Sequence, residues 1–387
     1  MPLRVLQNRS MALFERAFDR KPEIVCRAPG RIEFVGNHTD YNGGLVMGAA
    51  IDREVRVAMA LRTDGRRRFC SEIGDTVWEH AGELRPVSGD AAWTNYPTGV
   101  LAAMVARGLR TPVGFDYAVV SDLPRGAGLS SSAAIELASA LGFLGLTHQE
   151  VSREDLVNIG RAAENNFVGV PCGILDQGVS GFGRSGHLVA IDCRGPEFST
   201  VAMPSGSRFR VFNTPSSHAL VDGLYAARHR ECSQAAEILG VSLLADASLE
   251  MLEAKRARMP DEVFRRARHV VEEIERVRSM RAALAAGDLN EVGALLTASH
   301  RSSQHLFANS TAQLDWLVDH LVPVGGVLGA RLSGGGFGGA VMALTREGFG
   351  DREANRIAAT FAEAWGQPPT VLALNTADGA STVPPVC

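Results

Sequence analysis

Residues 124–134 have the sequence PRGAGLSSSAA and join a predicted strand, 115–120, to a predicted apolar helix, 133–146. Glycines at such a junction let backbone N–H groups come close to an anion, and the helix start adds the positive end of its dipole. Serine hydroxyls there can cap the helix or bind a magnesium ion that is held on a phosphate. The segment therefore predicts either a phosphate-binding loop or an ordinary serine-capped turn.

A second glycine-rich segment, GGGFGG at residues 334–339, formally matches the pattern Gly-x-Gly-x-x-Gly. The dinucleotide-binding fingerprint needs a strand before the glycines and a helix after them. Here a predicted strand, 340–344, follows instead. The pattern thus excludes a dinucleotide fold and predicts a tight turn packed against a ligand or another backbone segment.

The third segment, NHTDYNGG at residues 37–44, lies between two predicted strands, 31–35 and 45–51. Its short polar side chains suit hydrogen bonds to several hydroxyl groups of one ligand. The alternative is a solvated hairpin, for which the same residue types are common.

Lysine occurs only at Lys21 and Lys255 of the 387 residues, and neither follows a Gly-x-x-x-x-Gly pattern. A Walker-type P-loop is therefore excluded. The formal net charge is −4, so the chain has no basic surface excess of the kind that binds nucleic acid or anionic lipid. We expect neither nucleic acid nor a membrane as a partner.

The spacing of the cysteines and the hydropathy of the chain indicate in which cellular compartment the protein lies. The six cysteines are scattered without a Cys-x-x-Cys pair, which favours reduced thiols over disulfides or a zinc site. The first residues lack the apolar core of a signal peptide, and no uncharged apolar run is long enough to span a membrane. These features predict a cytoplasmic protein, which we expect to be a monomer or a weak homo-oligomer.

Predicted strands and helices are mixed along the chain without a regular βαβ alternation, which favours an α+β fold. After about residue 205 a long, charged, mostly helical region follows, from about 222 to 320. We place a domain boundary at this change, with an N-terminal domain at 1–203 and a C-terminal domain at 204–387.

Taken together, the segments resemble motifs of the GHMP kinases and, among them, the galactokinases. APGRIEFVGNHTDYN at 28–42 resembles the galactokinase signature, GAGLSSSAA at 126–134 is similar to the phosphate loop of the superfamily, and GARLSGGGFGG at 329–339 resembles its third motif. The resemblance implies two α+β domains with the active site in the cleft between them. It also implies ATP-dependent phosphorylation of the anomeric C1 hydroxyl of galactose or a galactose-like sugar.

The same resemblance assigns roles to individual residues. Asp176 is the expected catalytic base, with Arg31 beside it, where a guanidinium favours the ionised carboxylate and stabilises charge on the transferred phosphoryl group. Ser132 and Glu164 match the ligands of a Mg²⁺ ion. The residues expected to bind ATP are Trp93, Gly126, Ala127, Gly128, Leu129, Ser130, Ser131 and Ser132. The residues expected to bind the sugar are Asn37, His38, Asp40, Gly173 and Tyr225.

One position departs from the family pattern. Galactokinases usually carry Glu where this chain has Asn37, and that Glu accepts a hydrogen bond from the C6 hydroxyl of the sugar. A neutral amide at this position also admits a C6 carboxylate, so galacturonate is the alternative substrate. A third possibility is a non-catalytic, galactokinase-like sugar sensor, but the complete serine-rich loop and the presence of Asp176 favour an enzyme.

Overall fold

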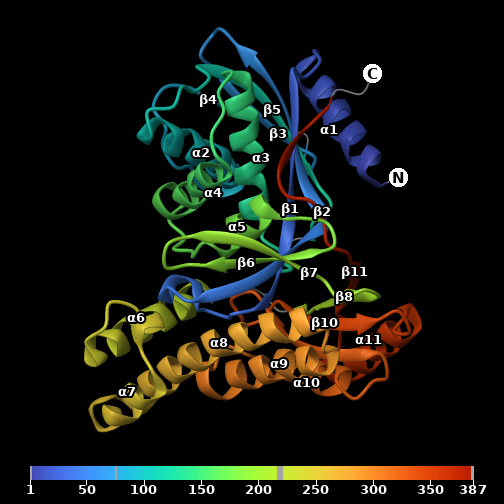
Figure 1. The fold of residues 1–387 in the computed structure, drawn as a ribbon. Coiled ribbons are helices and arrows are strands. Elements are labelled where there is room, and N and C mark those ends of the chain that lie inside the picture. Colours follow the sequence, from blue (N-terminus) through green and yellow to red (C-terminus); the bar gives the residue numbers. More distant parts are fainter. Residues whose placement is uncertain (1, 75, 125, 216–220, 385–387) are drawn as a thin grey trace.

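The computed structural model describes residues 2–74, 76–124, 126–215 and 221–384, which form two β-sheets covered by helices (Figure 1). The first sheet has eight strands, and the second has four. Most of the chain before about residue 203 forms the upper half of the molecule in Figure 1. Most of the chain after it forms the lower, helix-rich half. This arrangement confirms the predicted α+β class.

The first sheet has the order β12-β1-β2-β5-β3-β4, and β6 pairs with β2 and with β7. Its strands are β1 (Ile24–Val35), β2 (Leu45–Arg62), β3 (Arg67–Ser71), β4 (Val77–His80), β5 (Gly114–Ser121), β6 (His187–Asp192), β7 (Glu197–Ala202) and β12 (Ser381–Val383). The helices of this half are α1 (Pro2–Phe18), α2 (Asn95–Ala106), α3 (Ser131–Leu146), α4 (Arg153–Ala162) and α5 (Leu175–Phe182).

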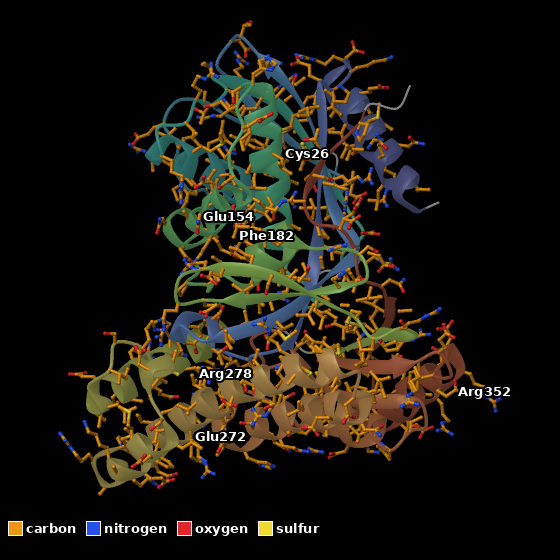
Figure 2. All side chains as sticks on the ribbon, in the orientation of Figure 1. Cys26, Glu154, Phe182, Glu272, Arg278 and Arg352 are labelled. Carbon is orange, nitrogen blue, oxygen red and sulfur yellow. The ribbon has the colours of Figure 1, made fainter. Side chains whose placement is uncertain are left out.

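The second sheet has the order β11-β8-β10-β9, with all neighbouring strands antiparallel. Its strands are β8 (Ser207–Asn213), β9 (Val327–Ser333), β10 (Ala340–Arg346) and β11 (Thr370–Leu374). The helices of this half are α6 (Val221–Leu239), α7 (Leu249–Ala254), α8 (Asp261–Ala286), α9 (Leu289–Ser302), α10 (Ala312–Leu321) and α11 (Asp351–Trp365). Of these, α9, α10 and α11 pack on the second sheet. Figure 2 shows charged side chains along this half, including Glu272 and Arg278 on α8 and Arg352 on α11.

The strands predicted at 31–35 and 45–51 are parts of two longer strands. Gly30, which precedes the first prediction, lies inside β1, and the polar residues 52–54, which follow the second, lie inside β2. A Cβ atom at Gly30 would lie 2.4 Å from Leu123 Cδ2 and 2.6 Å from Leu129 O. The glycine therefore lets β1 pass directly against the phosphate-loop segment, and it does not end the strand.

The helix that begins at Arg153 changes its geometry before it ends. α4 ends at Ala162, and a π-helical turn, Ala163–Val168, continues the chain to Gly169, whose φ is 86°. The predicted helical region 222–320 consists of α6 to α10 and the turns between them.

The predicted domain boundary lies between the two sheets, because β7 ends at Ala202 and β8 begins at Ser207. The end of the chain returns to the first sheet, where Val383 of β12 pairs with Val25 of β1. The aromatic rings of Phe34 and Phe209 meet edge to face at 6.2 Å, so the apolar core is continuous across the two sheets. The division at residue 203 stays a prediction.

Within the described ranges, none of the helices is both long enough and apolar enough to cross a lipid bilayer.

Candidate active site

A cavity of about 460 Å³ lies between the two halves of the chain. Arg31 and Glu33 of β1 and Asp176 of α5 line it from the first half, and Tyr225 of α6 lines it from the second. The other lining residues are Asn37, His38, Asp40, Glu164, Gly169, Val170, Pro171, Cys172, Gly173, Leu175, Ala226, Gly334 and Gly335. The cavity thus brings together residues from two of the three segments that the sequence singled out.

The alternation of β1 selects which of its side chains reach this cavity. Successive side chains of a strand point to opposite faces, so Arg31 and Glu33 share one face. Ile32 and Phe34, fully buried, occupy the other face and pack in the core. The β1–β2 register shifts on both sides of this pair, between Pro29 and Arg31 and again between Glu33 and Val35. Such irregularities commonly redirect side chains next to active sites.

Arg31 connects β1, α5 and the phosphate-loop segment. Its Nε donates to Asp176 Oδ1 at 2.8 Å, and its Nη2 lies 2.7 Å from the same oxygen. Its Nη1 donates to Gly128 O at 2.6 Å. Ser130 Oγ donates a hydrogen bond to Asp176 Oδ2. The carboxylate predicted to be the base is therefore held from both sides, and the structure brings it together with Arg31 as the sequence suggested.

The loop before α3 presents backbone to the site. Gly126 and Gly128 have φ of 67° and 64°, a region that glycine adopts without strain. The side chains of Ala127 and Leu129 are buried, 1% and 3% exposed, so this loop is anchored through its apolar side chains. Ser130 precedes α3, but its side chain makes no capping bond because it is directed to Asp176. The first N–H groups of α3 are thus left for an anion, as a phosphate-binding helix start requires.

Ser132 and Glu164, the two predicted metal ligands, lie next to each other. A hydrogen bond from Ser132 reaches the Glu164 carboxylate, and Gln177 Nε2 donates to Glu164 Oε2 at 2.6 Å. Burial raises the pKa of Glu164, and the charge of Asp176 adds to the rise. A hydroxyl and one carboxylate fit a Mg²⁺ ion that takes its other ligands from nucleotide phosphates and water. No cluster of three or more metal-ligating side chains occurs among the described residues, so the protein alone offers no complete metal cage.

Asp40 and Gly173 face each other in the cavity wall. A Cβ atom at Gly173 would lie 1.6 Å from Asp40 Oδ2, so only glycine leaves room for this carboxylate. Burial raises the pKa of Asp40 from 3.8 to about 6, and the charges of Asp176 and Glu33 add to the rise. The ionised Asp40 carboxylate is therefore costly in the empty cavity, and a ligand whose hydroxyl groups donate hydrogen bonds to it would stabilise it.

His38, Tyr41 and Tyr225 form an aromatic wall. The rings of His38 and Tyr225 are 5.0 Å apart, and those of Tyr41 and Tyr225 are 5.9 Å apart. His38 Nε2 lies 2.9 Å from Gly335 O, which only accepts, so Nε2 carries the proton and Nδ1 accepts from the Tyr41 hydroxyl at 3.0 Å. Burial lowers the pKa of His38 to about 3, which keeps the ring neutral. Both ring nitrogens therefore bond to protein groups, and the sugar contact of His38 stays a prediction.

Trp93 lies outside this group of residues. It is half-buried and packs at ring distances of 6.2 Å from Phe69 and 6.3 Å from Tyr117. Its predicted role in an adenine pocket stays a prediction.

Three polar residues of this site were not predicted from the sequence: Glu33, which lines the cavity, and Arg331 and Asn309, which lie behind it. Glu33 and Arg331 form an ion pair with 2.9 Å between Oε1 and Nη2, and Arg331 is fully buried. Asn309 Nδ2 donates to Asn37 Oδ1 at 2.8 Å. The available signal was Arg331, which is the only charged residue of β9 and needs a partner because a buried charge is costly.

Comparison with known proteins places this site in a class. The family model of the GHMP kinase N-terminal domain matches residues 95–184, and the model of the C-terminal domain matches residues 280–366. The galactokinase galactose-binding signature matches residues 12–61. The fold is thus that of a GHMP kinase.

Individual relatives narrow the class. A galactokinase of Roseiflexus sp. (strain RS-1) is 36% identical over 376 residues, which are 96% of this chain and 95% of that protein. A galactokinase of Homo sapiens is 38% identical over 340 residues, 86% of each chain. The crystal structure of Lactococcus lactis galactokinase complexed with galactose superposes with a TM-score of 0.93 at 29% identity, covering 98% of this chain and 100% of that one. The chain belongs to the galactokinase family.

Proposed function

We propose that this chain transfers the γ-phosphoryl group of ATP to the anomeric C1 hydroxyl of galactose, giving galactose 1-phosphate and ADP. The observation that carries the proposal is the position of Asp176, which lines the cavity and bonds to both Arg31 and Ser130. One carboxylate thereby links the proposed sugar site to the phosphate-loop segment. Membership of the galactokinase family supports the choice of galactose.

Phosphoryl transfer needs compensated phosphate charge, a positioned acceptor hydroxyl and an acceptor for its proton. Asp176 accepts the proton of the C1 hydroxyl as the oxygen attacks the γ-phosphorus. Arg31 lies beside Asp176 and stabilises the charge of the group in transfer. Because both side chains are held by protein contacts before substrate arrives, much of their effect comes from positioning.

The ATP phosphates bind to the backbone of residues 126–132 and to the start of α3, in place of the lysine of a Walker loop. Ser132 and Glu164 would hold a Mg²⁺ ion, which supplies positive charge that neutralises the phosphate oxygens. We keep Trp93 in the proposal as a contact for the adenine ring.

Sugar binding is assigned to the cavity wall that Asp40, Gly173 and Tyr225 line. Asp40 and Tyr225 approach the ring hydroxyls, with the backbone at Gly173 and the wall of His38 completing the site. Galacturonate is not favoured, because the carboxylate of Glu33 lies against the amide of Asn37 and restores the negative charge that Asn37 alone lacks.

A panel of sugars tests the function. The purified protein is incubated with ATP, Mg²⁺ and galactose, glucose or galacturonate, while ADP release and the ³¹P signal of the sugar 1-phosphate are recorded. We expect turnover with galactose and none with galacturonate. Asp176→Asn should remove turnover but retain galactose binding by calorimetry, and absence of ADP with every sugar would refute the proposal.

The proposal includes the cellular location, the oligomeric state and the partners of the protein. We infer that it acts in the cytoplasm as a monomer or weak homo-oligomer on small molecules alone. The described cysteines, Cys26, Cys70, Cys172, Cys193 and Cys232, are all free thiols, which supports a reducing compartment.

A further inference from the structure

The side-chain amide of Asn37 is saturated by protein contacts. Its Nδ2 donates to Glu33 Oε1 at 2.9 Å and to Gly334 O at 2.9 Å. Its Oδ1 accepts from Asn309 Nδ2 at 2.8 Å and from Ser303 Oγ at 3.3 Å. A primary amide has two N–H donors and an oxygen with two lone pairs, so these four contacts use its capacity. Asn37 therefore has no bond left for a sugar hydroxyl at the position where the family pattern has Glu.

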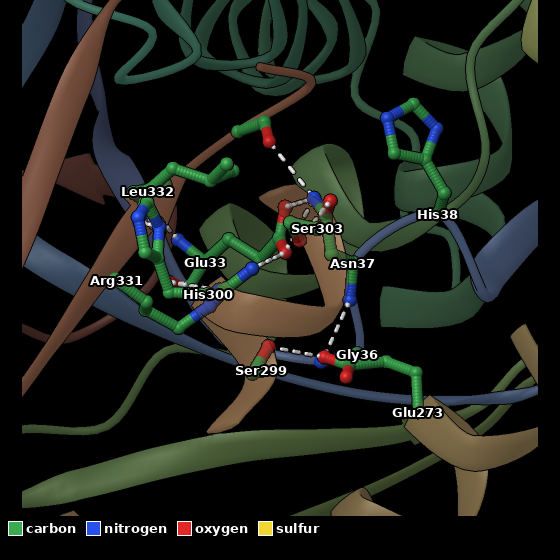
Figure 3. A network of polar contacts seen from close by, with 12 residues as sticks. Glu33, Gly36, Asn37, His38, Glu273, Ser299, His300, Ser303, Arg331 and Leu332 are labelled. Atoms are coloured by element: carbon green, nitrogen blue, oxygen red, sulfur yellow. Dashed lines mark hydrogen bonds and ion pairs between the residues drawn. The ribbon is translucent and has the colours of Figure 1, made fainter. Parts of the chain in front are cut away.

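The carboxylate of Glu33 lies four residues earlier in the chain and is the group to which this amide points (Figure 3). Oε1 accepts from Asn37 Nδ2 and from Arg331 Nη2, both at 2.9 Å. Oε2 accepts a longer bond of 3.3 Å, again from Asn37 Nδ2. An ionised carboxylate accepts about four hydrogen bonds. Within the described part of the chain, three contacts to its oxygens are found, so one acceptor position remains.

Glu33 is also in the right place to meet the sugar. It lines the cavity together with Asp40 and Tyr225. Its charge acts on both of them: after burial, which is the main cause, Glu33 contributes to the raised pKa values of Asp40 and Tyr225. The fully buried Arg331 gives Glu33 the compensating charge that a carboxylate needs inside a protein.

We propose that Glu33, and not Asn37, supplies the carboxylate that accepts a hydrogen bond from the C6 hydroxyl of the sugar and sets the preference for a neutral hexose. Asn37 orients this carboxylate and is a positioning residue. The inference rests on the proposed function, because it names the specificity determinant of that same site.

Two consequences follow for substrates. A galactose analogue without the C6 hydroxyl leaves the Glu33 acceptor unpaired in a buried site, which disfavours it. Galacturonate places a second carboxylate against Glu33, and this repulsion excludes it. A single charged acceptor thus discriminates against two kinds of sugar: one that lacks the C6 hydroxyl donor and one that carries a negative charge at C6.

The test compares galactose, 6-deoxygalactose and galacturonate by kcat/KM for ADP release. For the wild-type protein we expect at least tenfold preference for galactose over 6-deoxygalactose and no turnover of galacturonate. In Glu33→Gln the preference should fall to about threefold or less, and galacturonate should become a substrate. Glu54→Gln is the matched control, because Glu54 is equally buried at 3% exposed and paired with Arg56 but lies outside the cavity lining. It should keep the wild-type ratio.

Glu33→Gln leaves Arg331 buried without its partner, which endangers folding. The double variant Glu33→Gln/Arg331→Met removes both charges, and we expect it to show the same loss of preference. The proposal is overturned if the wild-type protein uses 6-deoxygalactose as well as galactose, if it accepts galacturonate, or if a folded Glu33 variant keeps the wild-type ratio. A wild-type protein that turns over no sugar refutes the proposed function, and this inference falls with it.

Discussion

Asp40→Asn should stabilise the ligand-free protein while abolishing tight sugar binding. Asp40 is half-buried in the cavity wall, with its carboxylate oxygen packed against the backbone of Gly173. Burial, followed by the charges of Asp176 and Glu33, raises its pKa from 3.8 to about 6. The ionised carboxylate is therefore costly to the empty protein, and the donors of a bound sugar offset that cost.

The sign and size of the stability effect follow from this pKa. Because the folded-state pKa of Asp40 lies above its ordinary value, its contribution disfavours folding above about pH 6 and vanishes below about pH 4. The difference between the two pKa values corresponds to at most about 3 kcal/mol, and partial solvent access reduces it to about 1–2 kcal/mol. An asparagine carries no charge, so we expect the melting temperature at pH 8 to rise by about 1–2 °C and to be unchanged near pH 4.

The same pKa governs sugar binding. For the wild-type protein, kcat/KM for galactose should be constant above about pH 7 and fall about tenfold for each pH unit below 6, as Asp40 becomes protonated. Thermal unfolding at pH 4 and pH 8, with and without galactose, and a pH profile of kcat/KM measure both effects. Exposed Asp90→Asn serves as the control. A kcat/KM that stays flat from pH 5 to 8, or an Asp40→Asn protein less stable than wild type at pH 8, would contradict the reasoning.

Two further substitutions test neighbouring parts of the site. In steady-state assays, Gly173→Ala should raise the KM for galactose at least tenfold with a smaller change in kcat, because the added Cβ would lie 1.6 Å from the Asp40 carboxylate. The control Gly348→Ala, where a Cβ meets no atom within 4 Å, should match the wild-type protein. Glu164→Gln should raise the Mg²⁺ concentration needed for half-maximal ADP release by about tenfold or more, since one of two protein ligands loses its charge. Exposed Glu154→Gln, on the preceding helix, should leave that concentration unchanged, and equal Mg²⁺ dependence in both variants would remove Glu164 from the metal site.

Much of the fold could be predicted because strands and helices leave local patterns. The helix after the phosphate-loop segment and the strand after the 334–339 turn lie where the sequence placed them. The part of β1 before Gly30 could not be joined to the predicted strand 31–35 from the sequence, because the reason for glycine there is a close approach to Leu129, about a hundred residues away in the chain. Local chemistry thus revealed a break in the pattern, but the contact that explains it is not local.

The charged residues of the site likewise could not be paired from local sequence patterns. Arg31 and Asp176 were paired beforehand only through family resemblance, and the structure brings them together. Glu33 and Arg331 lie in strands that are 298 positions apart, so no local pattern could join them. Asn37 consequently looked like the loss of a carboxylate. Its hydrogen bond to Glu33 shows that the negative charge is still present in the cavity.

The four carboxylates of the cavity divide by what balances their charge. Glu33 and Asp176 each have an arginine partner, Arg331 and Arg31, which fixes their positions in the empty protein. For Asp40 and Glu164, burial is the main cause of raised pKa values, so a ligand that adds donors or positive charge offsets the cost of ionising them. The arginine-paired groups are thereby suited to discrimination and chemistry, and the other two to binding. It follows that acid should weaken substrate and metal binding, because protonation of Asp40 and Glu164 removes the charge that these ligands meet.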